Sequence, residues 1–280
     1  MIVNLTSVLD AAGPTAVGSF NVLDLDMAAA VVEAAESLRR PVILGVATRH
    51  FEAIRTVALA PALRRLAERS AVPIALHLDH ASPRQRDLIA TALDLGFTSI
   101  MIDASQSPLE ENIRVTRAVL EQCQPYGASV EGELGGIAGE EGVADTHGAS
   151  LKALPYTDPS EAARYVAESG VQALAIAVGT AHGIYAAAPE ISFATIEHVR
   201  DRVPVPLVLH GSTGVRPEDI RRCVGCGIRK INFFSGLLAA AMNRVRLDAP
   251  NLGYDYLELK RRIVADCRAV AAEQIGLFAG

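Results

Sequence analysis

The sequence predicts a (β/α)8 barrel, on three observations. Eight short apolar runs rich in β-branched residues are typical of buried parallel strands, and segments with helical apolar spacing alternate with them. Polar residues gather at the carboxyl ends of these runs, where barrels of this kind carry their functional groups. The length of 280 residues suits one such barrel. We therefore expect a single domain over residues 1–280, with an extra carboxyl-terminal helical segment at Tyr254–Phe278.

The strands are expected at Ala16–Val22, Pro41–Val46, Pro73–Leu78, Ser99–Asp103, Ala128–Leu134, Ala173–Val178, Pro206–His210 and Arg229–Phe233. Helices are expected between them, at Met27–Leu38, Ala53–Ser70, Arg84–Leu95, Leu109–Cys123, Pro159–Ser169, Ser192–Arg202 and Pro217–Cys226. Ser82 and Asp158 each precede a proline, as residues that cap helix starts do. Glycines follow three of the helix ends: Gly96, Gly170 and Gly227.

The composition argues against several classes of function. The net charge of -6 leaves no basic footprint for nucleic acid or an anionic membrane surface, so neither is an expected partner. No apolar run approaches membrane-spanning length and Met1–Thr6 lacks a leader pattern, so we expect a cytoplasmic protein. The four cysteines form no disulfide framework for this length. Cys223 and Cys226 have metal or redox spacing, but without a second pair we interpret them as ordinary helix and turn residues.

Three histidines lie at predicted strand ends. His80 and His210 close apolar runs, and His182 follows a third run. Three imidazole nitrogens leave a fourth metal position open for substrate or water, which distinguishes catalytic zinc from closed structural zinc. The pattern suggests a catalytic zinc site, and Asp79 supplies a carboxylate beside it.

Other polar residues at predicted strand ends are Asp103, Glu131, Glu133 and Asn232. The longest irregular stretch, Gly135–Pro155, follows the fifth predicted strand. Loops of this length in compact domains are usually lids or binding loops. We therefore expect the long loop to reach the same end of the barrel as the histidines.

Eight fragments, taken in order, cover essentially the whole chain: Ser19–Val22, Pro41–Leu44, His77–His80, Gly96–Asp103, Glu110–Ile113, Val130–Gly135, Gly179–Gly183 and Lys230–Asn232. Together they resemble the class II, metal-dependent ketose-bisphosphate aldolases, which include fructose- and tagatose-bisphosphate aldolases. The resemblance implies an aldehyde-lyase that cleaves a phosphorylated ketose, such as fructose or tagatose 1,6-bisphosphate, into dihydroxyacetone phosphate and an aldehyde. It also implies a homo-oligomer, either a dimer or a tetramer.

The resemblance further implies roles for single residues. Zinc would be held by the three strand-end histidines: His80, His182 and His210. Asp79 would exchange the C4 hydroxyl proton of the ketose, and Glu141, on the long loop, would exchange a proton with the donor carbon. Asp103 and Glu133 map onto a second cation position, for a divalent or monovalent ion. Physically, a Lewis acid at the carbonyl offsets the negative charge that develops when the carbon–carbon bond breaks.

The substrate phosphate would be bound by backbone groups and hydroxyls that follow the last three strands: Gly183, Gly211, Thr213 and Ser235. Glycine lets the backbone approach an oxyanion closely, and hydroxyls donate to it. Asn232 would contact the dihydroxyacetone portion, and Asn21 also belongs to the implied substrate site.

Several residues depart from the family pattern. Ala47 and Thr48 replace part of a Gln-x-Ser type sequence, with the Thr48 hydroxyl one position out of register. Ser212 adds a side chain where a glycine is usual. Phe234 replaces a polar residue of the phosphate cup, which it should face because it lies two positions after Asn232. The donor therefore stays open among a bisphosphate, a ketose 1-phosphate, a sugar-acid phosphate and a less phosphorylated ketose.

Other interpretations also stay open. Asp103 and Glu133 are consistent with strand-end residues that orient a ligand or bind loop backbone, and Glu141 with a solvated carboxylate. Lys230 is the only lysine placed for Schiff-base chemistry, which the histidine set disfavours. If the chain were a non-catalytic barrel subunit, we would expect substitutions at the ligand or acid-base residues, and none of these residues is substituted. A metal-dependent hydrolase would need more ligands from the first strand, whose polar residues are only Ser19 and Asn21.

Overall fold

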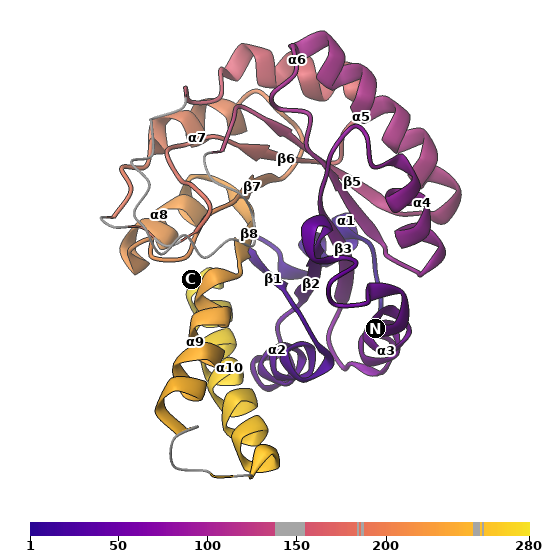
Figure 1. The fold of residues 1–280 in the computed structure, drawn as a ribbon. Coiled ribbons are helices and arrows are strands. Elements are labelled where there is room, and N and C mark those ends of the chain that lie inside the picture. The colour runs from indigo at the N-terminus through magenta and orange to yellow at the C-terminus, as the bar shows by residue number, and fades with distance from the viewer. Residues whose placement is uncertain (138–154, 184, 186–187, 249–252, 254) are drawn as a thin grey trace.

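The protein is described by a computed structural model over residues 1–137, 155–183, 185, 188–248, 253 and 255–280. Eight parallel strands form a closed barrel in chain order, which confirms the predicted fold. The strands are β1 (Val17–Asn21), β2 (Val42–Ala47), β3 (Ile74–Ala81), β4 (Ser99–Ile102), β5 (Ser129–Leu134), β6 (Ala173–Ile176), β7 (Leu207–Leu209) and β8 (Ile228–Phe233). Helices surround them, as Figure 1 shows.

The helices expected between the strands are all present: α2 (Leu25–Leu38), α3 (Thr56–Arg69), α4 (Arg86–Asp94), α5 (Leu109–Cys123), α6 (Pro159–Ser169), α7 (Phe193–Arg200) and α8 (Pro217–Cys226). Two short 3-10 turns follow β2 and α5, at Thr48–His50 and Gln124–Tyr126. Cys223 and Cys226 are buried free cysteines of α8, as interpreted. None of the helices in the described ranges is long and apolar enough to cross a membrane.

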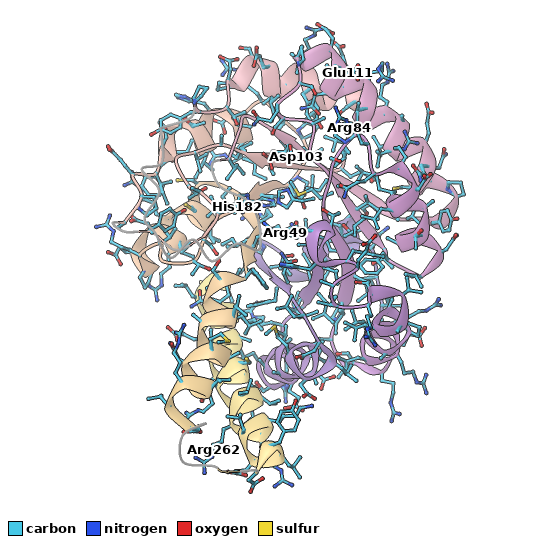
Figure 2. All side chains as sticks on the ribbon, viewed as in Figure 1. Arg49, Arg84, Asp103, Glu111, His182 and Arg262 are labelled. Carbon is cyan, nitrogen blue, oxygen red and sulfur yellow. The ribbon has the colours of Figure 1, made fainter. Side chains whose placement is uncertain are left out.

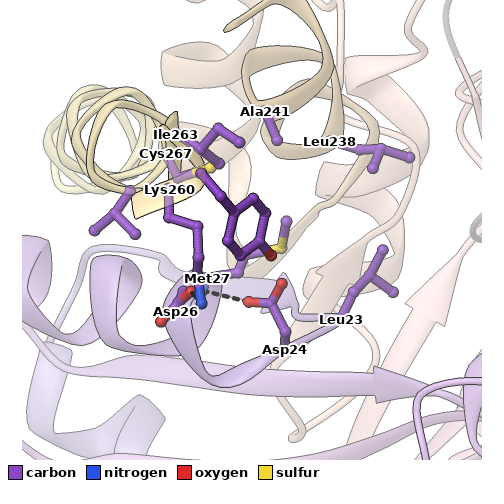
Figure 3. A pocket seen from close by; sticks show the side chains of 11 residues that line it. Leu23, Asp24, Asp26, Met27, Leu238, Ala241, Lys260, Ile263 and Cys267 are labelled. Atoms are coloured by element: carbon purple, nitrogen blue, oxygen red, sulfur yellow. Dashed lines mark hydrogen bonds and ion pairs between the residues drawn. The ribbon is translucent and has the colours of Figure 1, made fainter. Parts of the chain in front are cut away.

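Two helices complete the chain, α9 (Ser235–Asp248) and α10 (Tyr256–Phe278). The second is the expected carboxyl-terminal segment, and it packs against α2 and α9. The first was not among the expected helices. Figure 1 shows the pair in orange and yellow, extending from the barrel beside α2. A pocket of about 210 Å³ between α2, α9 and α10 is lined mostly by apolar side chains and by none of the predicted site residues (Figure 3).

The residues expected at helix starts and ends were predicted correctly, except Ser82. The Asp158 carboxylate accepts hydrogen bonds from the first turn of α6, and Gly170 ends that helix with a positive φ of 74°. Ser82, however, caps no helix, because α4 begins only at Arg86. Ser82 instead closes a turn: its backbone N–H donates to the side chain of Gln85, at 2.8 Å, and its carbonyl accepts from the backbone N–H of Gln85.

An additional short helix, α1 (Leu5–Ala12), closes the amino-terminal end of the barrel. Asn4 caps it by accepting from the Ser7 N–H, and Leu5, Val8 and Leu9 are buried against inward side chains of the strands. The side chains packed under α1 are mostly apolar, with one buried hydroxyl, that of Ser129, which accepts from the N–H of Thr6 at 3.4 Å. The predicted site residues lie in the other half, toward the carboxyl ends of the strands.

The third strand is irregular where it reaches that end. Consecutive strand residues normally face opposite sides of a sheet. Between Leu78 and Ala81 the pairing of β3 with β4 shifts register, and His80 has a φ of 109°. A bulge with a strained backbone re-aims side chains. It allows Asp79 and His80, although adjacent in sequence, to lie against the same cluster of groups.

Candidate active site

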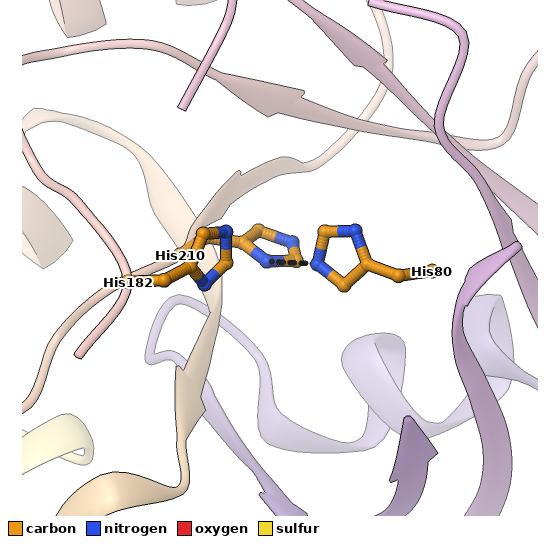
Figure 4. Close-up of side chains that lie close together, drawn as sticks. All are labelled: His80, His182 and His210. Atoms are coloured by element: carbon orange, nitrogen blue, oxygen red, sulfur yellow. Dashed lines mark hydrogen bonds between the residues drawn. The ribbon is translucent and has the colours of Figure 1, made fainter. Parts of the chain in front are cut away.

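The three predicted histidines meet at the carboxyl end of the barrel (Figure 4). His80 comes from the end of β3, His182 from the loop after β6, and His210 from the residue after β7. Their ring centroids are 4.8 to 5.7 Å apart, and one ring nitrogen from each lies within 4.8 Å of the other two. The rings stand nearly perpendicular to one another, at 75° to 79°. Three nitrogens converging on one point form the donor set that catalytic zinc takes.

Nε2 of His210 lies 2.9 Å from Oε1 of Glu131, and its Nδ1 lies 3.1 Å from Nε2 of His80. Because the pKa of Glu131 is lowered and an ionised carboxylate only accepts, this contact favours the tautomer with the proton on Nε2. Burial is the main cause that lowers the pKa of His210 to about 4, which keeps the imidazole neutral. A neutral imidazole whose second nitrogen donates to a carboxylate is the usual form of a zinc-ligating histidine. The residues present therefore fit a zinc ion.

Asp79 lies beneath the histidines and is fully buried. Its carboxylate accepts from Nδ2 of Asn21 at 2.7 Å and from Nδ2 of Asn232 at 3.1 Å. Burial by itself would raise the pKa of Asp79, but the neighbouring His80 and His77 hold that pKa well below its ordinary value. Asp79 is thus an ionised, oriented carboxylate that can accept a proton.

A second cluster shares His80 with the first. The Nδ1 atom of His80 lies 3.8 Å from Oδ2 of Asp103, and Glu133 completes a set of possible ligand atoms within 4.8 Å of one another. Burial and the neighbouring Asp103 raise the pKa of Glu133 to about 8, whereas the nearby His80 and hydrogen bonds from Ser105 lower the pKa of Asp103 despite its burial. Oε2 of Glu133 has no hydrogen-bond partner among the described residues. Two carboxylates with opposed shifts and an orphaned oxygen suit a bound cation.

The predicted phosphate residues lie on neighbouring loops. Gly211 has a φ of 67°, and a Cβ there would lie 2.2 Å from the carbonyl oxygen of Ala181, so the loops after β6 and β7 touch through their backbones. Gly183 also has a positive φ, of 102°. Thr213 accepts from the N–H of Gly236 at 3.3 Å, next to Ser235 at the start of α9. Backbone N–H groups at a helix start favour anions.

The departures from the family pattern have structural explanations. Ser212 donates to the backbone oxygen of Asn232 at 2.5 Å and joins the ends of β7 and β8. Thr48 donates to the backbone oxygen of His80 at 2.5 Å, and Ala47 is buried at the end of β2. Phe234 lies just beyond β8, where its carbonyl accepts from the N–H groups of Leu237 and Leu238 in the first turn of α9.

The Phe234 ring is buried beside His50, with ring centroids 5.5 Å apart. Because β8 ends at Phe233, Phe234 lies just beyond the regular alternation of that strand, and its place in the phosphate cup stays a prediction. Glu141 lies outside the described residues, as does most of the long loop. Figure 2 labels Asp103 and His182, which mark the two sides of the site.

Three residues with no predicted role support the site. Glu131 and Lys230 are buried in the barrel interior, with Oε2 and Nζ 2.8 Å apart. The hydroxyl of Tyr185 lies 2.7 Å from both the N–H of Ala181 and the carbonyl of Gly211, which ties together the two loops that carry His182 and His210. The sequence could have indicated Glu131 and Lys230, because charged residues inside buried strands are unusual. Nothing in the sequence around Tyr185 indicates its role.

The comparisons with known proteins agree with this architecture. The sequence profile of the family described as fructose-bisphosphate aldolase class-II matches residues 3–280. A fructose-bisphosphate aldolase of Geobacillus stearothermophilus is 42% identical over 225 residues, which cover 79% of this chain and 75% of that protein. The D-tagatose-1,6-bisphosphate aldolase subunit GatY of Klebsiella oxytoca is 40% identical over 227 residues, which cover 80% of this chain and 78% of GatY.

A crystal structure of the YdjI aldolase from Escherichia coli K12 superposes with a TM-score of 0.85 at 32% identity, covering 99% of this chain and 97% of that one. Because the family profile spans nearly the entire sequence and several relatives exceed 30% identity, the relationship extends beyond the fold. The chain belongs to the class II fructose-bisphosphate aldolase family, whose members are lyases.

Proposed function

We propose that this enzyme is a zinc-dependent aldolase that reversibly cleaves a phosphorylated ketose, such as fructose or tagatose 1,6-bisphosphate, into dihydroxyacetone phosphate and an aldehyde. The observation that carries the proposal is the convergence of His80, His182 and His210 beside the buried, ionised carboxylate of Asp79. A Lewis acid held by the histidines would polarise the ketose carbonyl and offset the negative charge of the donor half.

The side chains of this chain would move the protons. In cleavage, Asp79 accepts the C4 hydroxyl proton, the C3–C4 bond breaks, C4 becomes the aldehyde carbonyl, and the electron pair stays with C3 of the donor half. Asn21 and Asn232 hold the Asp79 carboxylate from two sides. From the family resemblance, Glu141 then delivers a proton to C3. Condensation reverses each step.

The donor phosphate would bind where the loops after β6, β7 and β8 meet. Gly183 and Gly211 offer backbone N–H groups, and the hydroxyls of Thr213 and Ser235 lie at the start of α9. Asp103 and Glu133 would hold a second divalent or monovalent cation. A donor other than a bisphosphate remains an alternative, because Ser212 and Phe234 alter the pattern around this site.

Schiff-base chemistry on Lys230 is disfavoured by its surroundings, because its buried ammonium already contacts Glu131 and Asn232. A non-catalytic subunit is the second alternative, since the related GatY is named as a subunit. Intact candidate ligands and an ionised Asp79 favour catalysis.

The proposal is tested by incubating the protein with fructose and tagatose 1,6-bisphosphates, ketose 1-phosphates and sugar-acid phosphates, and measuring release of dihydroxyacetone phosphate with and without a chelator. We expect release from at least one compound, loss of release with chelator, and recovery with added zinc. Chelator-resistant release would contradict zinc dependence. Near-zero divalent metal after metal-replete expression, without any release, would favour the non-catalytic subunit.

We further propose a single domain over residues 1–280 in a cytoplasmic homo-oligomer, either a dimer or a tetramer. Four large apolar side chains on α9 and α10 are 42% to 69% exposed: Met242, Leu247, Tyr256 and Leu257. A second copy of the chain is a suitable partner for such a surface. Light scattering after gel filtration measures the mass directly, and a monomer at all concentrations would contradict the oligomer.

A further inference from the structure

We infer that Lys230 is a positioning residue of the candidate active site, whose ammonium sets the orientation of the Asn232 carboxamide and, through Glu131, of the His210 imidazole. Lys230 belongs to β8 and has no exposed side-chain surface. Its Nζ lies 2.8 Å from Oε2 of Glu131 and 2.7 Å from Oδ1 of Asn232. The inference rests on the proposed function only in that Asp79, Asn232 and His210 are taken to serve catalysis.

The first branch runs through Asn232. A carboxamide has an accepting and a donating end of nearly the same shape, so its surroundings decide which end points where. An ammonium only donates, and it therefore selects the oxygen of Asn232. The amide nitrogen then faces two acceptors, Oδ1 of Asp79 at 3.1 Å and Nδ1 of His210 at 3.3 Å. A flipped amide would place its NH2 against the ammonium of Lys230 and its oxygen against the carboxylate.

The second branch runs through Glu131. One oxygen of this carboxylate pairs with Lys230, and the other accepts Nε2–H of His210 at 2.9 Å. The carboxylate thereby determines which ring nitrogen of His210 keeps a lone pair for a metal. All three side chains are fully buried, so no water replaces a lost partner from bulk solvent. Lys230 thus determines the donor geometry on both sides of the site.

The alternative is that Lys230 only neutralises Glu131 and has no orienting role. The two accounts differ for the double variant K230M/E131Q, which removes both charges at nearly constant volume. If neutralisation is the whole role, this variant regains the stability that K230M loses, and its His210 tautomers match those of E131Q alone. If Lys230 orients its neighbours, stability returns but the tautomers differ from those of E131Q, because only the ammonium fixes which end of the introduced carboxamide faces His210.

The experiment compares wild type, E131Q, K230M, K230M/E131Q and a matched control, K260M. Lys260 makes an ion pair with Asp26 at 2.5 Å on a partly exposed surface of α10. Each protein is stripped of metal, and its histidine ring nitrogens are recorded by 15N NMR at pH 8. Zinc affinity is then measured by competition with a chelator, the unfolding temperature by calorimetry, and kcat and KM at saturating zinc with the best substrate of the ketose screen.

For wild type and K260M we expect a single His210 tautomer with the proton on Nε2. For E131Q we expect one His210 tautomer, because the ammonium selects the oxygen of the introduced carboxamide and turns its NH2 toward Nε2. For K230M/E131Q we expect a near wild-type unfolding temperature, a mixture of His210 tautomers, and zinc affinity and kcat each lower by about 10–100-fold. K230M alone should be strongly destabilised, because it leaves Glu131 as a buried unpaired charge. The same tautomers in E131Q and the double variant, or wild-type zinc affinity in the double variant, would overturn the inference.

The readouts remain decisive in other cases. If neither variant folds, mixed His210 tautomers in the metal-free wild type still overturn the inference, and a single Nε2–H tautomer supports it. The NMR and zinc measurements need no substrate. If the enzyme cleaves a ketose but the His210 tautomers differ from those expected, only this inference is refuted. If the expected tautomers are found but no ketose is cleaved, only the proposed function is refuted.

Discussion

The hydroxyl of Thr48 donates to the backbone carbonyl oxygen of His80 at 2.5 Å and so links the turn after β2 to the bulge in β3. His80 has a φ of 109°, which non-glycine residues adopt only when their surroundings compensate the strain. The bond lies at the point where β3 turns Asp79 and His80 toward the same cluster. A residue outside the predicted site thereby supports the geometry of two residues inside it.

Thr48→Val should destabilise the protein by about 1–3 kcal/mol, because it leaves the His80 carbonyl without its donor. Zinc affinity should fall as well, since the His80 ring loses its backbone support. Thr91→Val is the control, because the Thr91 hydroxyl also donates to a backbone carbonyl, at 2.9 Å, but on the exposed face of α4. Urea unfolding and a zinc titration measure the two effects. Equal behaviour of the two variants would show that the bond does not support the site.

Tyr185→Phe should weaken zinc binding by about 10-fold, within the range for residues that orient metal ligands. The hydroxyl contacts Ala181 and Gly211, each next to a proposed ligand. Tyr126→Phe is the matched control, because Tyr126 donates to Asp94 at 2.6 Å on an exposed surface. Zinc competition assays on both variants decide the matter. Unchanged zinc affinity in Tyr185→Phe would mean that the two loops hold their positions without it.

Gly211→Ala should be far more damaging than Gly127→Ala, although both glycines have a φ near +65°. The strain of a positive φ, about 1–2 kcal/mol, is common to both variants. Only at Gly211 would the new Cβ meet a backbone oxygen, that of Ala181, whereas nothing lies within 4 Å at Gly127. Overpacking adds about 1–3 kcal/mol and separates the two loops. Equal losses of unfolding free energy would show that the loops separate at no cost.

Ser235→Ala should weaken a phosphorylated donor by about 1–3 kcal/mol, the usual range for hydrogen bonds to charged groups, and leave a non-phosphorylated donor almost unaffected. Ser107→Ala, at a half-buried position after β4, is the control. Binding is compared through KM or calorimetric titration for the two kinds of donor. If the best phosphorylated substrate binds equally well to Ser235→Ala, the phosphate site implied by the family does not apply here.

The fold was predictable because buried parallel strands leave a strong apolar signal and the helices between them are amphipathic. The carboxyl-end rule then placed His80, His182 and His210 together without any knowledge of distances. Short elements were harder to predict. The eight residues of α1 owe their helix to burial of Leu5, Val8 and Leu9 inside the barrel, which is a tertiary effect.

Contacts between residues far apart in the sequence could not be predicted either, because they too depend on tertiary packing. The alternation of side chains along a strand does not reveal the bulge at Asp79 and His80, nor that β8 ends before Phe234. Ser212 and Thr48 depart from the family pattern beside the implied substrate site, but their hydroxyls donate to backbone oxygens of neighbouring strands. Such partners depend on how separate strands come together, which local patterns do not encode.

The central claim is that three histidines hold a catalytic zinc ion while Asp79 moves protons, and one paired measurement tests it. Zinc content and ketose cleavage are measured together in His210→Ala and Asp79→Asn, with His198→Ala, an exposed histidine of α7, and Asp10→Asn, an exposed aspartate of α1, as controls.

His210→Ala should lose both zinc and turnover, because two histidines do not hold the ion in its open tetrahedral geometry. Asp79→Asn should keep zinc and lose turnover by about 10²–10⁴-fold. Full zinc occupancy with turnover in His210→Ala, or wild-type rates in Asp79→Asn, would contradict the account.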